Sequence, residues 1–296
     1  MTAQVVYLLA LVPALLWGFS PILSKRGMVD GGSSLQASLV VVVVDTSLYA
    51  LALLVIQGTA LFRDLSLHSA GLFFLAGVVG TALGRLAVFT GVDRVGASVN
   101  SAAVSTRPLF ATAMAAILLG EAVTLPTVVG IVVLVVGLTV LTVSRGGDIR
   151  GWGPRDLLFP LAAAFLFGIG NVARRFGLLA FPEVTLLEAV ALNEVGAMVA
   201  LVGYAVYAGR LDVLRAPKRT YVYFSGSGAI TAVALLALFA ALQRGRVAIV
   251  DPLAATAPLF TPIFAAVFLR DVERVTRGVV MGAVLVVIGV VLITGF

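Results

Sequence analysis

Residues 87–110 read AVFTGVDRVGASVNSAAVSTRPLF, and residues 237–260 read ALFAALQRGRVAIVDPLAATAPLF. At this offset of 150 positions, aromatic, Arg and final Pro-Leu-Phe positions coincide. The same offset pairs ALLWGFSPILSKRG at 14–27 with AFLFGIGNVARRFG at 164–177. Leu- and Val-rich segments align almost anywhere, but these matches involve Gly, Pro, Arg and aromatic residues at one fixed offset. The chain is therefore predicted to be a duplicated unit of about 150 residues.

The composition indicates an integral membrane protein. Of the 296 residues, 61% are hydrophobic and 11% are charged, whereas soluble domains carry about 25% charge. So many apolar residues must face lipid or other buried helices. The absence of Cys and the single His predict no cofactor and no metal site. The net charge of +6 is assigned to short loops beside anionic headgroups rather than to nucleic-acid binding.

Ten apolar spans, each of roughly bilayer length, follow one another along the chain. Their continuous runs differ from the alternating pattern of a membrane β-barrel. The first lacks a basic leader and a small-residue cleavage site, so it is predicted to be a retained helix. The spans cover residues 5–24, 35–57, 70–90, 97–119, 124–143, 156–177, 185–207, 221–242, 247–269 and 276–295.

Five spans per unit is an odd number, so the second unit starts on the opposite side of the membrane from the first. The sequence therefore predicts an all-α integral membrane protein of ten transmembrane helices, built as two inverted five-helix repeats around a central cavity. The predicted boundaries are 1–143 for the first repeat, 144–155 for the linker and 156–296 for the second. Five Lys and Arg residues lie on the N-terminal side and thirteen on the other, which predicts termini outside the cytoplasm.

The charged residues that lie deep inside the predicted spans, rather than near their ends, are Asp45, Arg85, Arg107 and Glu194. A charge at membrane depth costs about 2.5–3.5 kcal/mol on insertion scales, so such residues are read first as functional. They would bind the ammonium and carboxylate of a zwitterion, or carry a coupling proton. The structural alternative is that the two carboxylates pair with the two arginines and only hold helices together.

Aromatic, polar and helix-bending residues complete the candidate site. Trp17 and Phe167 occupy equivalent places in the two repeats, where packing is the plain alternative. The residues predicted to line the cavity are Trp17, Asp45, Tyr49, Arg85, Arg107, Phe167, Asn171 and Glu194. The residues predicted to break helices or to act in gating, rather than as simple kinks, are Gly18, Pro21, Pro108, Gly168, Pro258 and Pro262.

Glycines seven residues apart in the fifth and tenth spans indicate close helix packing where the repeats meet. They are Gly130 and Gly137, then Gly282 and Gly289. With them, the stretches LLWGFSPILSK (15–25) and RPLFATAMAAILLGEAVTLPTVVGIVVLVVG (107–137) resemble the ten-helix EamA-type branch of the drug/metabolite transporter superfamily. The motif elements that carry the resemblance are Pro108, Glu121, Thr124, Gly130 and Gly137, with second copies at Pro258, Glu273, Thr276, Gly282 and Gly289.

This resemblance implies a secondary transporter of small metabolites in the bacterial inner membrane, often an exporter, with a cavity between spans 1, 3, 4, 6, 8 and 9. The function expected is export or facilitated passage of amino acids, hydrophobic or aromatic ones above all, by a monomer in the lipid bilayer. Two alternatives stay open: exchange of sugar phosphates or nucleotide sugars, and proton-coupled efflux of lipophilic cations. An enzyme is not expected, because the chain has no GxSxG motif and no cluster of metal ligands.

Overall fold

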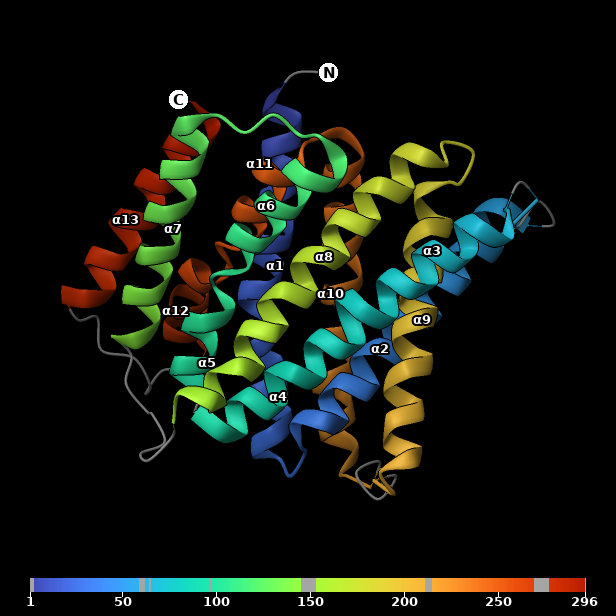
Figure 1. The fold of residues 1–296 in the computed structure, drawn as a ribbon. Coiled ribbons are helices and arrows are strands. Elements are labelled where there is room, and N and C mark those ends of the chain that lie inside the picture. Colours follow the sequence, from blue (N-terminus) through green and yellow to red (C-terminus); the bar gives the residue numbers. More distant parts are fainter. Residues whose placement is uncertain are drawn as a thin grey trace.

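The computed structural model describes residues 3–58, 62–63, 65–95, 97–144, 153–210, 215–268 and 277–295, and these parts contain helices and no strand. Figure 1 shows the helices side by side as one bundle, with both ends of the chain at the same end of it. The elements are α1 (Ala3–Val29), α2 (Ser34–Gln57), α3 (Leu67–Gly77), the π-helix η2 (Val78–Leu83), α4 (Gly84–Val95), α5 (Ala97–Val104), α6 (Arg107–Leu119), α7 (Leu125–Val143), the 3-10 helix η3 (Pro154–Leu157), α8 (Leu158–Ala180), α9 (Leu186–Tyr207), α10 (Lys218–Arg244), α11 (Val247–Ala254), α12 (Ala257–Phe268) and α13 (Arg277–Thr294).

Every predicted span is helical in the part of the chain that is described. Seven helices are long and apolar enough to cross a membrane, and three shorter apolar helices lie at 125–140, 247–261 and 280–294. The ten-helix membrane architecture is thus confirmed. The third span differs from expectation, because α3 and α4 are joined through η2 rather than forming one regular α-helix.

The fourth and ninth spans are each broken into two helices. A turn at Ser105 and Thr106 separates α5 from α6, and a turn at Ala255 and Thr256 separates α11 from α12. In α6, Pro108 lies in the first turn, where proline costs no intrahelical hydrogen bond. Pro258 has the corresponding position in α12.

Three residues predicted to break helices do not do so. Helix α1 runs without interruption through Gly18 and Pro21, and α8 runs through Gly168. The two glycines instead allow close approach to a broken helix. A methyl group on Gly18 would lie 2.7 Å from the Phe260 Cβ atom of α12, and one on Gly168 would lie 3.1 Å from the backbone nitrogen of Ala111 in α6. Pro262 lies inside α12.

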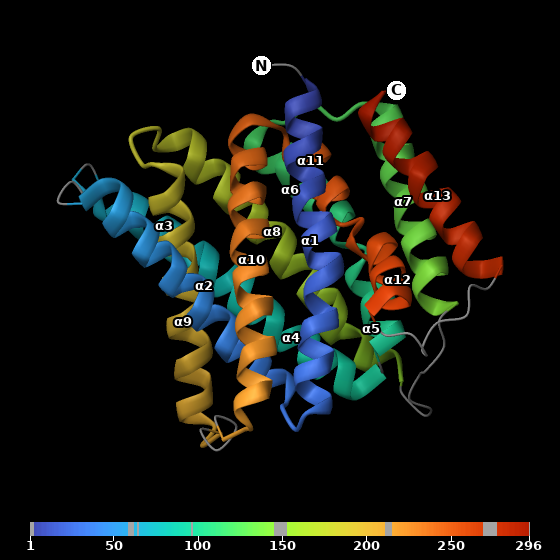
Figure 2. The ribbon, with the colours of Figure 1, turned by 180° about the vertical axis from the view of Figure 1, so that it is seen from behind.

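The two repeats pack their helices in the same way. Helix α1 lies along α10 (Figure 2), and its counterpart α8 lies along α3, η2 and α4. In both pairs a buried phenylalanine ring covers a glycine: Phe224 of α10 covers Gly27, and Phe73 of α3 covers Gly177. Because Gly27 and Gly177 are 150 positions apart, the contact is itself duplicated.

Helices α7 and α13 form a pair at one edge of the bundle (Figure 1). Glycines bring their backbones together, as predicted. A methyl group on Gly130 would lie 2.8 Å from the Gly289 carbonyl oxygen, and one on Gly137 would lie 2.7 Å from the Val286 nitrogen. Helices α2 and α9 form a second pair of this kind. In each pair, one helix comes from each repeat, and the two occupy equivalent places, so both pairs lie at the interface between the repeats.

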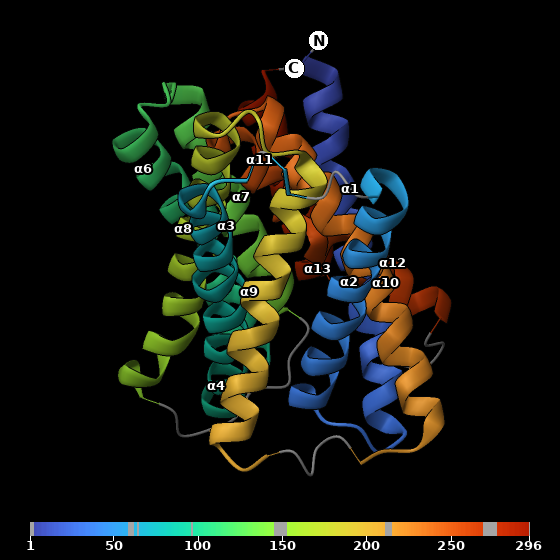
Figure 3. The same cartoon turned by 90° about the vertical axis from the view of Figure 1, so that its right-hand side faces the viewer.

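The largest apolar core lies toward the end of the bundle at which α1 begins and α13 ends, here named the terminal end (Figure 3). It includes Ala10 early in α1, Ala115 late in α6, Leu242 late in α10 and Val247 at the start of α11. These positions all lie on the helix segments nearest that end. Packing is therefore continuous at the terminal end, which leaves the middle and the opposite end for a cavity.

Candidate functional site

A cavity of about 370 Å³ lies among α1, α2, η2, α4, α6, α8 and α10. Its wall uses the second half of α1, from Trp17 to Ser24, and the first half of α2, from Ala37 to Val41. Both segments lie in the half of the bundle that is opposite the terminal end (Figure 1). Of the spans implied by the family resemblance, spans 1, 3, 4, 6 and 8 contribute; α2 is an addition, and none of the described residues of α11 or α12 lines the wall.

Six of the predicted residues line this cavity: Trp17, Pro21, Arg85, Arg107, Phe167 and Asn171. Asp45, Tyr49 and Glu194 were expected there and instead lie behind the wall, fully or almost fully buried. Helices α2 and α9 pack against each other, and Asp45 and Glu194 are buried between them. The Tyr49 hydroxyl instead donates to the Ala232 carbonyl of α10.

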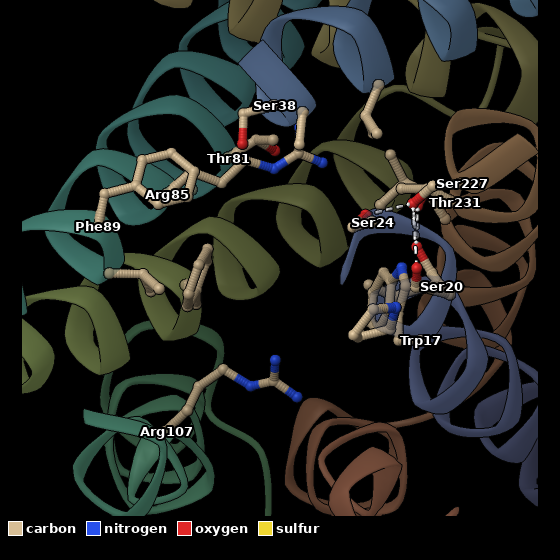
Figure 4. A pocket seen from close by; sticks show the side chains of 18 of the residues that line it. Trp17, Ser20, Ser24, Ser38, Thr81, Arg85, Phe89, Arg107, Ser227 and Thr231 are labelled. Atoms are coloured by element: carbon tan, nitrogen blue, oxygen red, sulfur yellow. Dashed lines mark hydrogen bonds between the residues drawn. The ribbon is translucent and has the colours of Figure 1, made fainter. Parts of the chain in front are cut away.

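The cavity has two chemically different sides. Figure 4 shows Arg85 and Arg107 on one side, facing Trp17 and a cluster of hydroxyl groups on the other. In that cluster the Ser20 and Ser227 hydroxyl oxygens are 2.6 Å apart, and the Ser24 and Ser227 oxygens are 2.9 Å apart. Because α1 and α10 contribute these residues, the hydroxyl side is formed by the long helix pair described above.

Arg107 is held by a buried carboxylate. Its Nε atom donates to Asp251 Oδ2 at 3.1 Å, and its Nη2 atom donates to the Asp251 carbonyl at 3.3 Å. The Asn171 side-chain amide donates to the other oxygen of Asp251. The break between α5 and α6 places Arg107 at the first position of α6, from which it reaches α11. Arg107 therefore pairs with Asp251, and not with Asp45 or Glu194, the pairing that the structural alternative named.

Arg174 of α8 is almost fully buried and uses its donors within the protein. Its Nε atom donates to Asn193 Oδ1 at 2.9 Å, Nη1 to Asn171 Oδ1 at 2.7 Å and Nη2 to Thr81 Oγ1 at 2.7 Å. Its guanidinium carbon lies 5.5 Å from the centre of the Phe239 ring. Arg174 touches the cavity, but its hydrogen-bonding capacity is directed to α8, α9 and η2.

Arg85 differs from these two arginines. It lines the cavity, its buried Nη1 atom has no hydrogen-bond partner, and no hydrogen bond or ion pair joins Arg85 to another side chain in the described ranges. It lies two residues after η2, whose Gly80 packs on Gly170 so closely that a methyl group would lie 2.5 Å from the Gly170 Cα atom. π-Helical segments are frequent at functional sites, because they rotate the following residues relative to a regular helix.

The terminal end is closed by polar contacts as well as by the apolar core. Arg175 Nη1 donates to the Leu242 carbonyl at 2.6 Å, late in α10. Glu121 accepts from the backbone nitrogens of Val247 at 2.9 Å and Ala248 at 3.2 Å, at the start of α11. The Arg175 Nε atom lies 3.9 Å from the Glu121 Oε1 atom, so the two side chains form an ion pair. These contacts, named here the terminal latch, join α8, α10, α11 and the segment after α6.

Several residues of the site were not singled out from the sequence. Arg174 and Asp251 lie near the ends of the predicted spans 156–177 and 247–269, where charged residues are common. The spacing of Arg174 could have identified it. It lies three residues after Asn171 and seven after Phe167, so a helix places all three on one face. The hydroxyl cluster carried no signal of its own, because Ser and Thr are common in membrane helices.

Comparison with known proteins agrees with this architecture. The model of the EamA-like transporter family matches residues 4–143 and again residues 155–295. An uncharacterised protein of Methanocaldococcus jannaschii is 25% identical over 138 residues, which is 47% of this chain and 95% of that protein. That relative is thus about one repeat long. A chain of known crystal structure is similar in fold, with a TM-score of 0.78 at 17% identity, over 98% of this chain and 96% of its own.

Proposed function

Because the chain belongs to the EamA-like transporter family, we propose that it carries amino acids and related carboxylates across the inner membrane, as an exporter or facilitator working by alternating access. The observation that supports this proposal most directly is that Arg85 lines the cavity and has no protein partner in the described part of the chain. A guanidinium group binds a carboxylate through two parallel hydrogen bonds. Arg107 and Arg174 are already held by protein acceptors, so the site offers one carboxylate position.

The other side of the cavity suits the rest of an amino acid. The hydroxyl oxygens of Ser20, Ser24 and Ser227 accept hydrogen bonds from an ammonium group. The Trp17 ring adds attraction for a cation over its face. Leu235 and Leu238 provide apolar surface for a hydrophobic side chain. The cavity volume of about 370 Å³ lies at the small end of ligand pockets, which span roughly 300–1,000 Å³.

Alternating access is supported by the uneven packing of the two ends. The cavity extends away from the terminal end, where apolar packing and the terminal latch close the bundle. In inverted-repeat carriers, exchange of the two repeat conformations converts such a one-sided state into its opposite. Gly27 and Gly177 make equivalent contacts in the two repeats. Equivalent packing of this kind is what allows each repeat to take the conformation of the other.

The test is counterflow in liposomes. Purified protein is reconstituted with each of several unlabelled amino acids inside, and entry of a labelled hydrophobic or aromatic amino acid is followed. We expect exchange above empty liposomes, and at least a tenfold loss in Arg85→Gln, because a lost charge-assisted bond is worth about 1.5–3 kcal/mol. Arg94→Gln is the matched control, since Arg94 is exposed and lies outside the cavity. Absence of exchange by folded protein with every amino acid would reject the proposal.

A second candidate is exchange of phosphorylated metabolites. The observation in its favour is that three arginines and no Asp or Glu are among the described residues that line the cavity. The same observation argues against efflux of lipophilic cations. Counterflow with inorganic phosphate and a sugar phosphate distinguishes the two anion classes. Flux of phosphates without flux of amino acids would replace the first proposal by the second.

A further inference from the structure

Two carboxyl groups meet in the centre of the protein, behind the cavity wall. Asp45 of α2 and Glu194 of α9 have no solvent-exposed surface. Their helices pack against each other, and the two carboxyl groups interact electrostatically. Their helices are counterparts in the two repeats, and the residues are one position from strict equivalence at the offset of 150. Near-equivalent groups on two counterpart helices that pack together lie close to the axis that relates the repeats, so this pair lies near that axis.

The hydrogen bonding of the pair is incomplete. Glu194 Oε1 accepts from the Asn193 side-chain amide at 2.8 Å. The other three oxygens, Glu194 Oε2 and both of Asp45, have no donor among the residues that the structure describes. Ionised carboxylates only accept hydrogen bonds, so neither group can satisfy the other unless one of them carries a proton. Leaving both ionised would bury two like charges, each at a cost of several kcal/mol.

The charged groups around the pair do not neutralise both carboxylates. Arg85 on α4 and Arg174 on α8 are the cations that face the pair, and Tyr49 on α2 is the other titratable group beside it. No ion pair joins either arginine to either carboxyl in the described ranges. Tyr49 donates to the Ala232 carbonyl of α10, and η2 contributes only the Thr81 hydroxyl, which accepts from Asn193 and Arg174.

A chain of polar groups connects the pair to the cavity. Glu194 is bonded to Asn193, Asn193 Nδ2 lies 3.3 Å from Thr81 Oγ1, and Thr81 lines the cavity. Arg85 lines the cavity as well and also acts on Asp45 electrostatically. A negative charge bound to Arg85 on the cavity side weakens the hold of Arg85 on an ionised Asp45, which favours a proton there. By linkage, the proton in turn favours the bound anion.

We propose that Asp45 and Glu194 form a binding site for one exchangeable proton, and that Arg85 couples this proton to a carboxylate substrate so that the two bind together. Of the two modes under the proposed function, this coupling fits the facilitator, because an inward proton gradient drives co-transport inward and not export. The coupling rests on the proposed function, whereas the proton site does not. Because the pair lies near the axis between the repeats, exchange of the repeat conformations interchanges the two carboxyls and keeps the proton central. The proton thus has the same binding groups in both states of the carrier.

The proton site is tested by infrared spectroscopy of the reconstituted protein without substrate, as a function of pH. We expect the wild type to show the C=O band of a buried carboxylic acid, which shifts in D2O and disappears as pH rises. The band should be lost in Asp45→Asn and in Glu194→Gln, since an amide then donates to the remaining carboxylate. Glu183→Gln, at an exposed carboxyl, should keep it. A wild type without such a band at any pH, or a band unchanged in either variant, would overturn the proposal.

The coupling is tested by binding of a labelled amino acid to detergent-solubilised protein over the same pH range. We expect wild-type affinity to increase up to tenfold for each unit by which pH falls, within the range where the band titrates, and the affinity of Asp45→Asn to be independent of pH. A titrating band together with pH-independent wild-type affinity would reject coupling while leaving the proton site. If the wild type binds no amino acid, the same comparison is made with a sugar phosphate, so failure of the substrate assignment is recognised separately.

Discussion

Arg107 and Asp251 form an ion pair whose members differ in their contact with the cavity. The Arg107 side chain is 15% exposed, whereas the Asp251 side chain is completely buried. Removing one member of a buried pair is more harmful than replacing both, because the remaining charge keeps its desolvation cost without compensation.

We therefore expect Arg107→Met to lower the free energy of unfolding by about 3–5 kcal/mol, measured by chemical denaturation in detergent. The double variant Arg107→Met with Asp251→Asn should recover most of this loss, since an uncharged amide replaces the buried charge. If the two single substitutions were merely additive in the double variant, the pair would not be the reason for the loss.

The sequence identified part of the site at the residue scale. Arg85, Arg107 and Asn171 were predicted to face the cavity and do so, because charged and amide groups in an apolar span have few other places to go. It did not distinguish Asp45 and Glu194, which are equally polar but turned toward a helix interface. That difference depends on the rotation of each helix about its axis, and lipid-facing and core-facing sides of a membrane helix are both apolar.

At the scale of elements, the end of α3, where η2 begins, and α9 are packed with no space between their backbones. A methyl group on Gly77, which precedes η2, would lie 1.7 Å from the Asn193 carbonyl oxygen. Asn193 belongs to the polar chain that leads to Glu194, so the position of this backbone is important for the site as well as for packing.

Gly77→Ala should therefore lower the free energy of unfolding by about 3 kcal/mol or more, since neither backbone can move aside easily. Gly71→Ala in α3 is the matched control, because a methyl group there meets no atom within 4 Å. The control should be neutral or gain up to about 1 kcal/mol from helix propensity. Equal thermal stability of the two variants in detergent would contradict the close contact.

The elements themselves were largely predictable. Length and hydropathy located all ten spans, and the seven-residue glycine spacing located the contact between α7 and α13. The breaks at Thr106 and Thr256 were foreseen only as bends at nearby prolines, and η2 was not foreseen. Within η2, Gly80 lies directly against Gly170 of α8, a tertiary contact that the local sequence does not contain.

For the whole molecule, we expect the terminal latch to keep the terminal end closed while the cavity is accessible from the opposite end. The chain contains no Cys, so a single introduced thiol reports access to its own position. Ser38→Cys in the cavity wall should react rapidly with a membrane-impermeant thiol reagent, whereas Leu242→Cys, which replaces a fully buried residue, should be protected.

Adding Glu121→Gln should increase the reaction rate of Leu242→Cys by about tenfold or more, because charge-assisted hydrogen bonds to Val247 and Ala248 are weakened. The reaction rate of Ser38→Cys should fall or stay the same. If Glu121→Gln accelerated both thiols equally, it would have loosened the fold generally rather than shifted the balance between the two ends.

The duplicated packing of the two repeats has an energetic consequence. If both repeats had identical sequences, the two one-sided states would contain the same contacts, related by a two-fold rotation, with equal free energy and equal populations. Any preference for one state must then come from positions at which the repeats have diverged, such as Arg175, whose equivalent in the first repeat is Lys25. Each 1.4 kcal/mol of such divergence changes the ratio of the states about tenfold, so a few unmatched residues are enough to determine the side on which the carrier rests.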